Sequence, residues 1–139
     1  MDKVREEYFD PLHFIYSDST EGIDVRVNVQ FVPKQSDPRI NYYFFAYTVT
    51  IENTSNRIVQ LVNRHWIIRD GQGHQEIVYG EGVIGQRPVI VPNHQFVYTS
   101  FCPIRTQTGS MRGHYEMKDI SSSGSGDQIL FKVKIIILK

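Results

Sequence analysis

The sequence of 139 residues contains a single cysteine, Cys102, no excess charge of either sign and no long apolar run. One cysteine excludes an internal disulfide and is typical of a reducing compartment, so we expect a cytoplasmic protein. The 15 basic and 15 acidic side chains cancel, whereas nucleic-acid-binding proteins usually carry a basic excess. No stretch approaches the roughly 18 apolar residues of a membrane span, and the charged start is unlike a secretory signal. We therefore expect no nucleic-acid binding and no direct membrane insertion.

Alanine and leucine, the usual residues of helical cores, are scarce: 1 Ala and 4 Leu stand against 16 Ile and 14 Val. β-Branched residues favour strands. Apolar and polar residues alternate along Ile23–Phe31, Met111–Lys118 and Ile129–Ile137, which is typical of half-buried strands. Seven or eight short strands predict an all-β fold, an antiparallel β-sandwich. The chain is interpreted as one domain, 1–139, with residues 1–10 as a flexible N-terminal segment.

Two local signals refine this prediction. Apolar residues change from odd positions at Leu61 to even positions at Trp66, which predicts a β-bulge near Asn63-Arg64. Asp70-Gly71 predicts a tight hairpin turn, because such a turn requires a positive φ at its centre.

Aromatic side chains fall on both faces of the predicted strand from Tyr42 to Ile51. Odd positions hold Tyr43, Phe45 and Tyr47. We expect these to face the core and Tyr42 and Phe44 to form a patch on the opposite face. Exposed aromatics often mark an interface, so this patch is a candidate site for a partner protein or for a second copy in a homodimer. Alternatively, the loop from Pro33 to Arg39 covers them.

The segment Gly80-Glu81-Gly82-Val83-Ile84-Gly85 matches the dinucleotide-binding pattern in its letters. That pattern works at the start of a helix and with an acidic residue about 20 positions later. Here Pro88 and Pro92 oppose a helix, and no acid occurs between Gly82 and Tyr115. We expect Gly80, Gly82 and Gly85 to serve loop geometry, at least one of them with positive φ.

The same acid-free stretch carries Arg87, Arg105 and Arg112. Glycine-rich backbone amides near arginines are suited to binding an anion. The alternative is that the arginines lie on separate faces of the sandwich. If a small ligand binds, we expect it beside one of these arginines rather than in the loop, where Glu81 would repel phosphate.

Several longer segments resemble the ApaG family, in the family's order and spacing, from about Ile23 to the end of the chain. They are Tyr43 to Asn53, Arg64 to Ile68, Gly80 to Pro88, Tyr98 to Pro103 and Thr108 to Tyr115. Arg112 stands where the family usually has an acid. The resemblance implies an immunoglobulin- or fibronectin-III-like sandwich.

The resemblance also implies a function. The stand-alone bacterial type is also called CorD and is associated with cobalt and magnesium efflux, and related domains bind other proteins. We therefore expect a non-enzymatic module that binds an unidentified protein partner and needs no cofactor. The alternative is a small-anion or nucleotide-pyrophosphate binder, or an enzyme accessory linked to diadenosine tetraphosphate.

Other reactive side chains form no recognised pattern. His74 and Glu76 share a strand face and His65, His94 and His114 are candidates to join them, but no zinc spacing occurs, so we expect no metal site. Ser100, Ser110 and His114 are residue types found in catalytic triads, but their spacing in the sequence does not establish a triad geometry. Cys102 has no evident base, and Trp66 is interpreted as a core residue. No catalytic residue is predicted.

Overall fold

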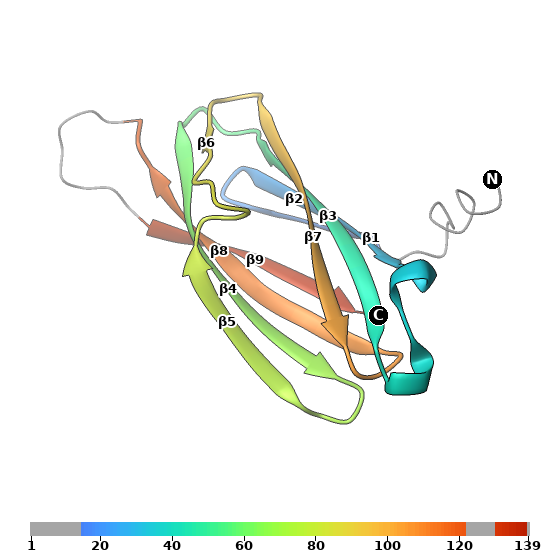
Figure 1. Ribbon diagram of the computed structural model, residues 1–139. Coiled ribbons are helices and arrows are strands. Elements are labelled where there is room, and N and C mark those ends of the chain that lie inside the picture. Colours follow the sequence, from blue (N-terminus) through green and yellow to red (C-terminus); the bar gives the residue numbers. More distant parts are fainter. Residues whose placement is uncertain (1–14, 122–129, 139) are drawn as a thin grey trace, which may run out of the picture.

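In a computed structural model, which describes residues 15–121 and 130–138, the chain folds into two antiparallel sheets packed face to face (Figure 1). The first sheet has the order β1-β2-β3-β7. Its strands are β1 (Ile15–Thr20), β2 (Ile23–Phe31), β3 (Tyr43–Asn53) and β7 (Gln95–Ile104). The second has the order β5-β4-β8-β9. Its strands are β5 (Gln75–Glu81), β4 (Val59–Asp70), β8 (Gly109–Asp119) and β9 (Leu130–Leu138). The predicted all-β sandwich is confirmed.

One further strand, β6 (Val89–Ile90), has only two residues and pairs with the start of β4. The helical elements among the described residues are two short 3-10 turns, η1 (Pro33–Gln35) and η2 (Pro38–Ile40), which precede β3. In the described part of the chain, no helix has the length and apolar character needed to span a membrane.

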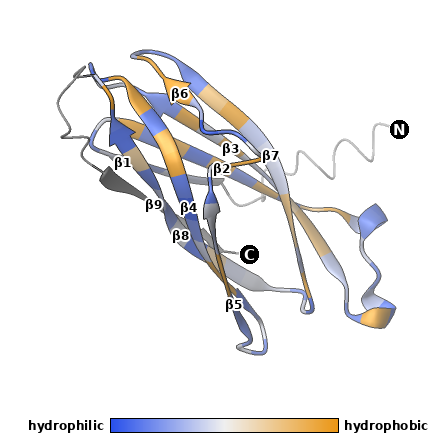
Figure 2. Ribbon diagram, turned by 60° about the vertical axis from the view of Figure 1, so that its left-hand side comes forward, coloured by the Kyte–Doolittle hydropathy of each residue, from blue (hydrophilic) through white to orange (hydrophobic). Residues whose placement is uncertain are grey.

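The core lies between the sheets and is built from alternate residues of each strand. Blue and orange therefore alternate along several strands in Figure 2, which is coloured by hydropathy. In β2, the side chains of Ile23, Val25 and Val27 are fully buried, while those between them are half-buried. In β3, Phe45 and Tyr47 are buried, as predicted, and Tyr43 packs against the core but is only partly buried. Trp66 is only 2% exposed and packs against Tyr47 and Tyr115, so it is a core residue.

The predicted β-bulge is present in β4, one residue earlier than expected. The register between β4 and β8 shifts between Leu61 and Asn63, so one residue of β4 has no direct partner. Because side chains alternate between faces, the extra residue turns the even positions inward. Arg64 therefore pairs with Tyr115 in β8 and faces the interior of the sandwich.

The hairpin predicted at Asp70-Gly71 is present between β4 and β5, but it is not the tight two-residue turn expected. The hairpin between β4 and β5 is a longer loop in which Gly73, not Gly71, has the positive φ of 90°. The Asp70 side chain instead accepts hydrogen bonds from the amides of Gln72 and His74. These bonds stabilise a wider loop than the dipeptide suggests. The N-terminal segment 1–10 lies outside the described residues.

Candidate functional site

The glycine motif forms a turn rather than the start of a helix. Val83 and Gln86 exchange two backbone hydrogen bonds of 2.8 Å, and the two residues between them have positive φ, 44° at Ile84 and 77° at Gly85. Two such residues inside a paired bridge are typical of a tight hairpin turn. Ile84 is β-branched, for which this conformation is strained, and its side chain is 53% exposed. The turn projects from the end of β5 toward β7 (Figure 1).

Gly82 occupies a position in the fold that has no room for a side chain. Its φ is 63°, and its amide donates to the carbonyl oxygen of Val62 at 2.7 Å. A Cβ atom on Gly82 would lie 2.1 Å from the carbonyl oxygen of Gln86. The expectation that at least one glycine has positive φ is confirmed, at Gly82 and at Gly85.

Gly80 has a different role, because it makes room for Arg64. The two residues pair across β4 and β5, and a Cβ atom on Gly80 would lie 3.0–3.1 Å from three atoms of the Arg64 guanidinium. Nη1 of Arg64 donates to the carbonyl oxygen of Glu81 at 3.1 Å and to that of Gly82 at 2.8 Å. The arginine therefore lies across Gly80 and is held by the beginning of the turn.

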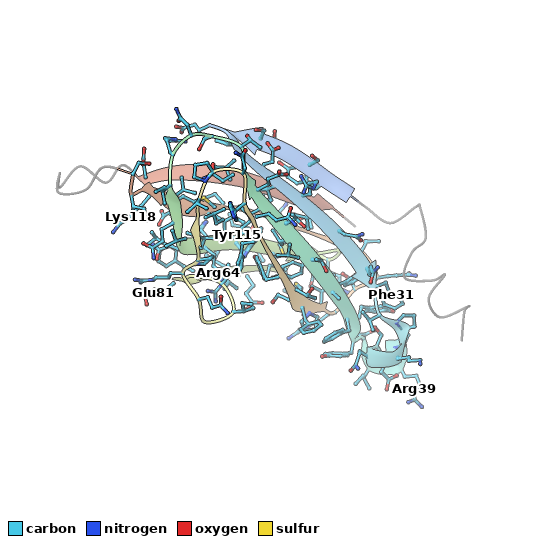
Figure 3. The ribbon with its side chains drawn as sticks, turned by 90° about the horizontal axis from the view of Figure 1, so that it is seen from above. Phe31, Arg39, Arg64, Glu81, Tyr115 and Lys118 are labelled. Carbon is cyan, nitrogen blue, oxygen red and sulfur yellow. The ribbon has the colours of Figure 1, made fainter. Side chains whose placement is uncertain are left out.

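Beside Arg64 lies a hollow of about 330 Å³, here called the Arg64 hollow. It is lined by Tyr47, Arg64, Glu81, Val83, Ile84, Gly85, Tyr98 and Ser100. Arg64 and Glu81 come from the second sheet and the tyrosines and Ser100 from the first, so the hollow lies between the sheets. In Figure 3, Arg64 lies between Tyr115 and Glu81.

The tyrosines near Arg64 are neutral phenols. Burial raises the pKa of Tyr47, Tyr98 and Tyr115, and the positive charge of Arg64 opposes that rise at each of them. The hydroxyls of Tyr98 and Tyr115 bond to each other, and Ser100 is the cross-strand partner of Tyr47. These hydroxyls bring polarity to the hollow without any negative charge.

The three arginines singled out from the sequence do not converge. Nη2 of Arg87 lies 2.7 Å from the carboxylate of Glu81, outside the turn. Arg105 follows the far end of β7, and Arg112 is exposed on β8 opposite Ile67. Binding of a small ligand beside any one of them stays a prediction. Sequence reasoning passed over Arg64, although the bulge signal places its side chain inward.

A second feature is an aromatic face on the outer side of the first sheet, formed by Tyr42, Phe44 and Phe101. Its ring centroids are 6.3 Å apart for Tyr42 and Phe44 and 5.2 Å for Phe44 and Phe101. The turn before β3 is bonded to the edge of this face, since the Ser36 hydroxyl accepts a hydrogen bond from the Phe44 amide, and Phe44 is half-buried. Tyr42 stays 37% and Phe101 57% exposed. The sequence did not point to Phe101, because this residue joins the face only through the pairing of β3 with β7, where its partner is Ala46.

The histidines do not gather at one site. His65 and His114 are direct neighbours on β4 and β8, with ring centroids 5.1 Å apart, and Nε2 of His114 lies 3.8 Å from the Glu116 carboxylate. His74 instead pairs with Asp70. Within residues 15–121 and 130–138, no three histidine, cysteine or acidic side chains form a group suited to a metal ion.

The candidate nucleophiles are not activated by their surroundings. Burial, and then the nearby Glu76 charge, raises the pKa of Cys102 to about 11, so the thiol is protonated at neutral pH. Ser100 faces the interior from the first sheet, whereas His114 and Ser110 lie at even positions of β8, on the face opposite to the buried Met111 and Tyr115. The triad drawn from the sequence is therefore not assembled.

Comparisons with known proteins agree with this fold. The family model described as the ApaG domain matches residues 33–119. The chain is 48% identical to Protein ApaG of Pseudomonas paraeruginosa over 101 residues, 73% of this chain and 80% of that protein. It is 44% identical to Protein ApaG of Bradyrhizobium diazoefficiens over 115 residues, 83% of this chain and 87% of that one. The crystal structure of a Bordetella pertussis protein named ApaA superimposes with a TM-score of 0.74 at 40% identity, covering 87% of this chain and 93% of that one. The chain belongs to the ApaG domain family.

Proposed function

We propose that this protein is a non-enzymatic interaction module whose aromatic face binds a partner protein. The observation that carries the proposal is the exposed cluster of Tyr42, Phe44 and Phe101. Aromatic side chains are enriched in protein interfaces, and neighbouring ones are costly to leave in water. The association of the family with cobalt and magnesium homeostasis suggests that the partner acts in the handling of divalent cations.

The size of the face favours a transient complex with another protein over a stable homodimer. A specific stable interface buries roughly 800 Å² on each partner. The aromatic face consists of only three side chains, of which Tyr42 and Phe101 are exposed and Phe44 is half-buried. Next to the aromatic face the surface is polar, where the hydroxyls of Thr48 and Thr99 bond at 3.0 Å. A small apolar centre with a polar rim is the usual layout of a non-obligate interface.

The alternative, a binder of nucleotide pyrophosphates connected to diadenosine tetraphosphate, has less support. No helix begins at the glycine motif, so its amides are not arranged as in dinucleotide-binding proteins. Glu81 lies in the segment and brings a negative charge to the place where phosphate would bind.

Affinity capture with matched variants tests the proposal. Phe101→Ser removes the most exposed ring, while Val97→Ser changes a 48% exposed residue on the same face of β7. We expect one defined protein to be captured by the wild type and by Val97→Ser and to be lost with Phe101→Ser. Equal capture by all three refutes the aromatic face as the site. Calorimetric titration with nucleotides gives the second arm, and binding of diadenosine tetraphosphate would favour the alternative function.

A further inference from the structure

We propose that the Arg64 hollow is a binding site for a carboxylate group, carried by a small organic acid or by a peptide C-terminus. The site is separate from the aromatic face and lies between the sheets. Its proposed recognition element is the guanidinium of Arg64, with the hydroxyls of Tyr47 and Ser100 on the opposite wall.

The charge of Arg64 has no counterion in the described part of the chain. Its two hydrogen bonds go to backbone carbonyl oxygens, and both use Nη1. Arg64 is half-buried, and an arginine that is partly removed from water usually pairs with a carboxylate, because its uncompensated charge loses favourable hydration. The nearest acidic side chain of the hollow, Glu81, is itself paired with Arg87 at 2.7 Å. One positive charge is therefore left for a ligand.

The position of the guanidinium is fixed in advance. It lies across Gly80, where no side chain competes for the space, and two carbonyl oxygens hold one of its nitrogens. Nε and Nη2 make no hydrogen bond within the described residues. These two atoms form one edge of the guanidinium fork, which matches the two oxygens of a carboxylate.

The rest of the hollow selects among anions. Val83 and Ile84 provide an apolar wall for the carbon chain of an organic acid. A single uncompensated charge balances a monoanion, whereas a phosphate dianion would meet the Glu81 carboxylate without a second free cation. Ile84 forms the tip of the turn in a strained backbone conformation, and strain of this kind often occurs at ligand sites. A carboxylate is therefore favoured over phosphate.

NMR titration of the wild-type protein tests this proposal with four probes: acetate, inorganic phosphate, a short peptide with a free C-terminus and the same peptide amidated. We expect acetate and the free peptide to shift the amide signals of Gly82, Val83 and Ser100 and the Arg64 Nε signal. Tighter binding of the free peptide than of acetate would identify a chain terminus as the ligand, and equal binding a small organic acid. The amidated peptide should leave these signals unchanged, and phosphate should bind more weakly than acetate.

Two variants assign the binding to the guanidinium. Arg64→Gln should weaken acetate binding at least about tenfold, the effect of losing a charge-assisted hydrogen bond. Arg69→Gln, an exposed position later in the same strand, should bind as the wild type does. Trp66 fluorescence checks that each variant is folded. Gly80→Ala displaces the guanidinium without removing its charge and should also weaken binding. Absence of shifts with acetate, unchanged affinity in Arg64→Gln, or phosphate binding that equals acetate binding would each overturn the proposal.

Discussion

Replacing Gly82 by alanine should destabilise the fold by about 2–5 kcal/mol. Alanine at the observed φ of 63° costs about 1–2 kcal/mol in backbone strain. In addition, the new Cβ atom would lie 2.1 Å from the Gln86 carbonyl oxygen, so the turn has to move. That movement breaks the Gly82–Val62 hydrogen bond or the paired bonds of Val83 and Gln86, and a buried backbone group without a partner costs about 1–3 kcal/mol.

Gly85→Ala is the matched control for this prediction. Gly85 has the same kind of backbone conformation, with a φ of 77°, but a Cβ atom there would meet nothing within 4 Å. Its loss of stability should be about 1 kcal/mol, because the backbone strain is partly offset by reduced freedom of the unfolded chain. Urea unfolding followed by the fluorescence of Trp66, the single tryptophan, measures both free energies. Equal losses for the two variants would refute the steric argument. A Gly82→Ala variant as stable as the wild type but with lost nucleotide affinity would show that the glycines serve a cofactor instead.

Three further predictions concern buried polar groups. Tyr98→Phe should lower the free energy of unfolding by about 1–3 kcal/mol, because it leaves the buried Tyr115 hydroxyl without its partner, and the double Phe variant should recover part of this loss in urea titrations. Asn53→Ala should destabilise the fold by at least about 2 kcal/mol in thermal unfolding, since the fully buried amide donates to the carbonyls of Arg57 and Ile90 and accepts from Ser55. Burial raises the pKa of Cys102 to about 11 in the folded protein. As the pH rises above 9.0, the thiol of the unfolded chain loses its proton before that of the folded protein. The free energy of unfolding should therefore fall between about pH 9 and 11. Cys102→Ser should remove the part of the loss that begins near pH 9, whereas the buried tyrosines, whose pKa values are also raised, should still lower stability above pH 10. Rapid reaction of the native thiol with a disulfide reagent at pH 8 would contradict the raised pKa of Cys102.

The sequence predicted those strands correctly in which one face of the strand is buried and the other is exposed to solvent. In β2 and β8 the period of two determines the register, because a slip by one residue would expose the whole core face. The parity change at Leu61 and Trp66 predicted the bulge for the same reason. The turn at Asp70 was less predictable, because hydrogen bonds from its side chain compete with the tight turn that Asp-Gly favours.

The candidate sites were only partly predictable, because they combine residues from strands distant in sequence. Tyr42 and Phe44 were found from their position on one strand, but Phe101 joins them through the pairing of β3 with β7. Arg64 likewise meets Tyr98 and Ser100 across the sandwich, and that arrangement depends on how the two sheets pack. From the sequence we instead selected Arg87, Arg105 and Arg112. Arg105 follows β7 and Arg112 lies on β8, so these two are not next to the glycine motif in the fold.

Site-specific photo-crosslinking in living cells tests the central claim most directly. A benzophenone amino acid replaces Phe101 or Tyr42 on the aromatic face, and Ile77, exposed on β5 of the other sheet, serves as the control position. The interaction-module account predicts one adduct of the same mass from positions 101 and 42 and none from position 77, with mass spectrometry identifying a different protein as the partner. Adducts that contain only a second copy of this chain, or no adduct from either aromatic position, would contradict it.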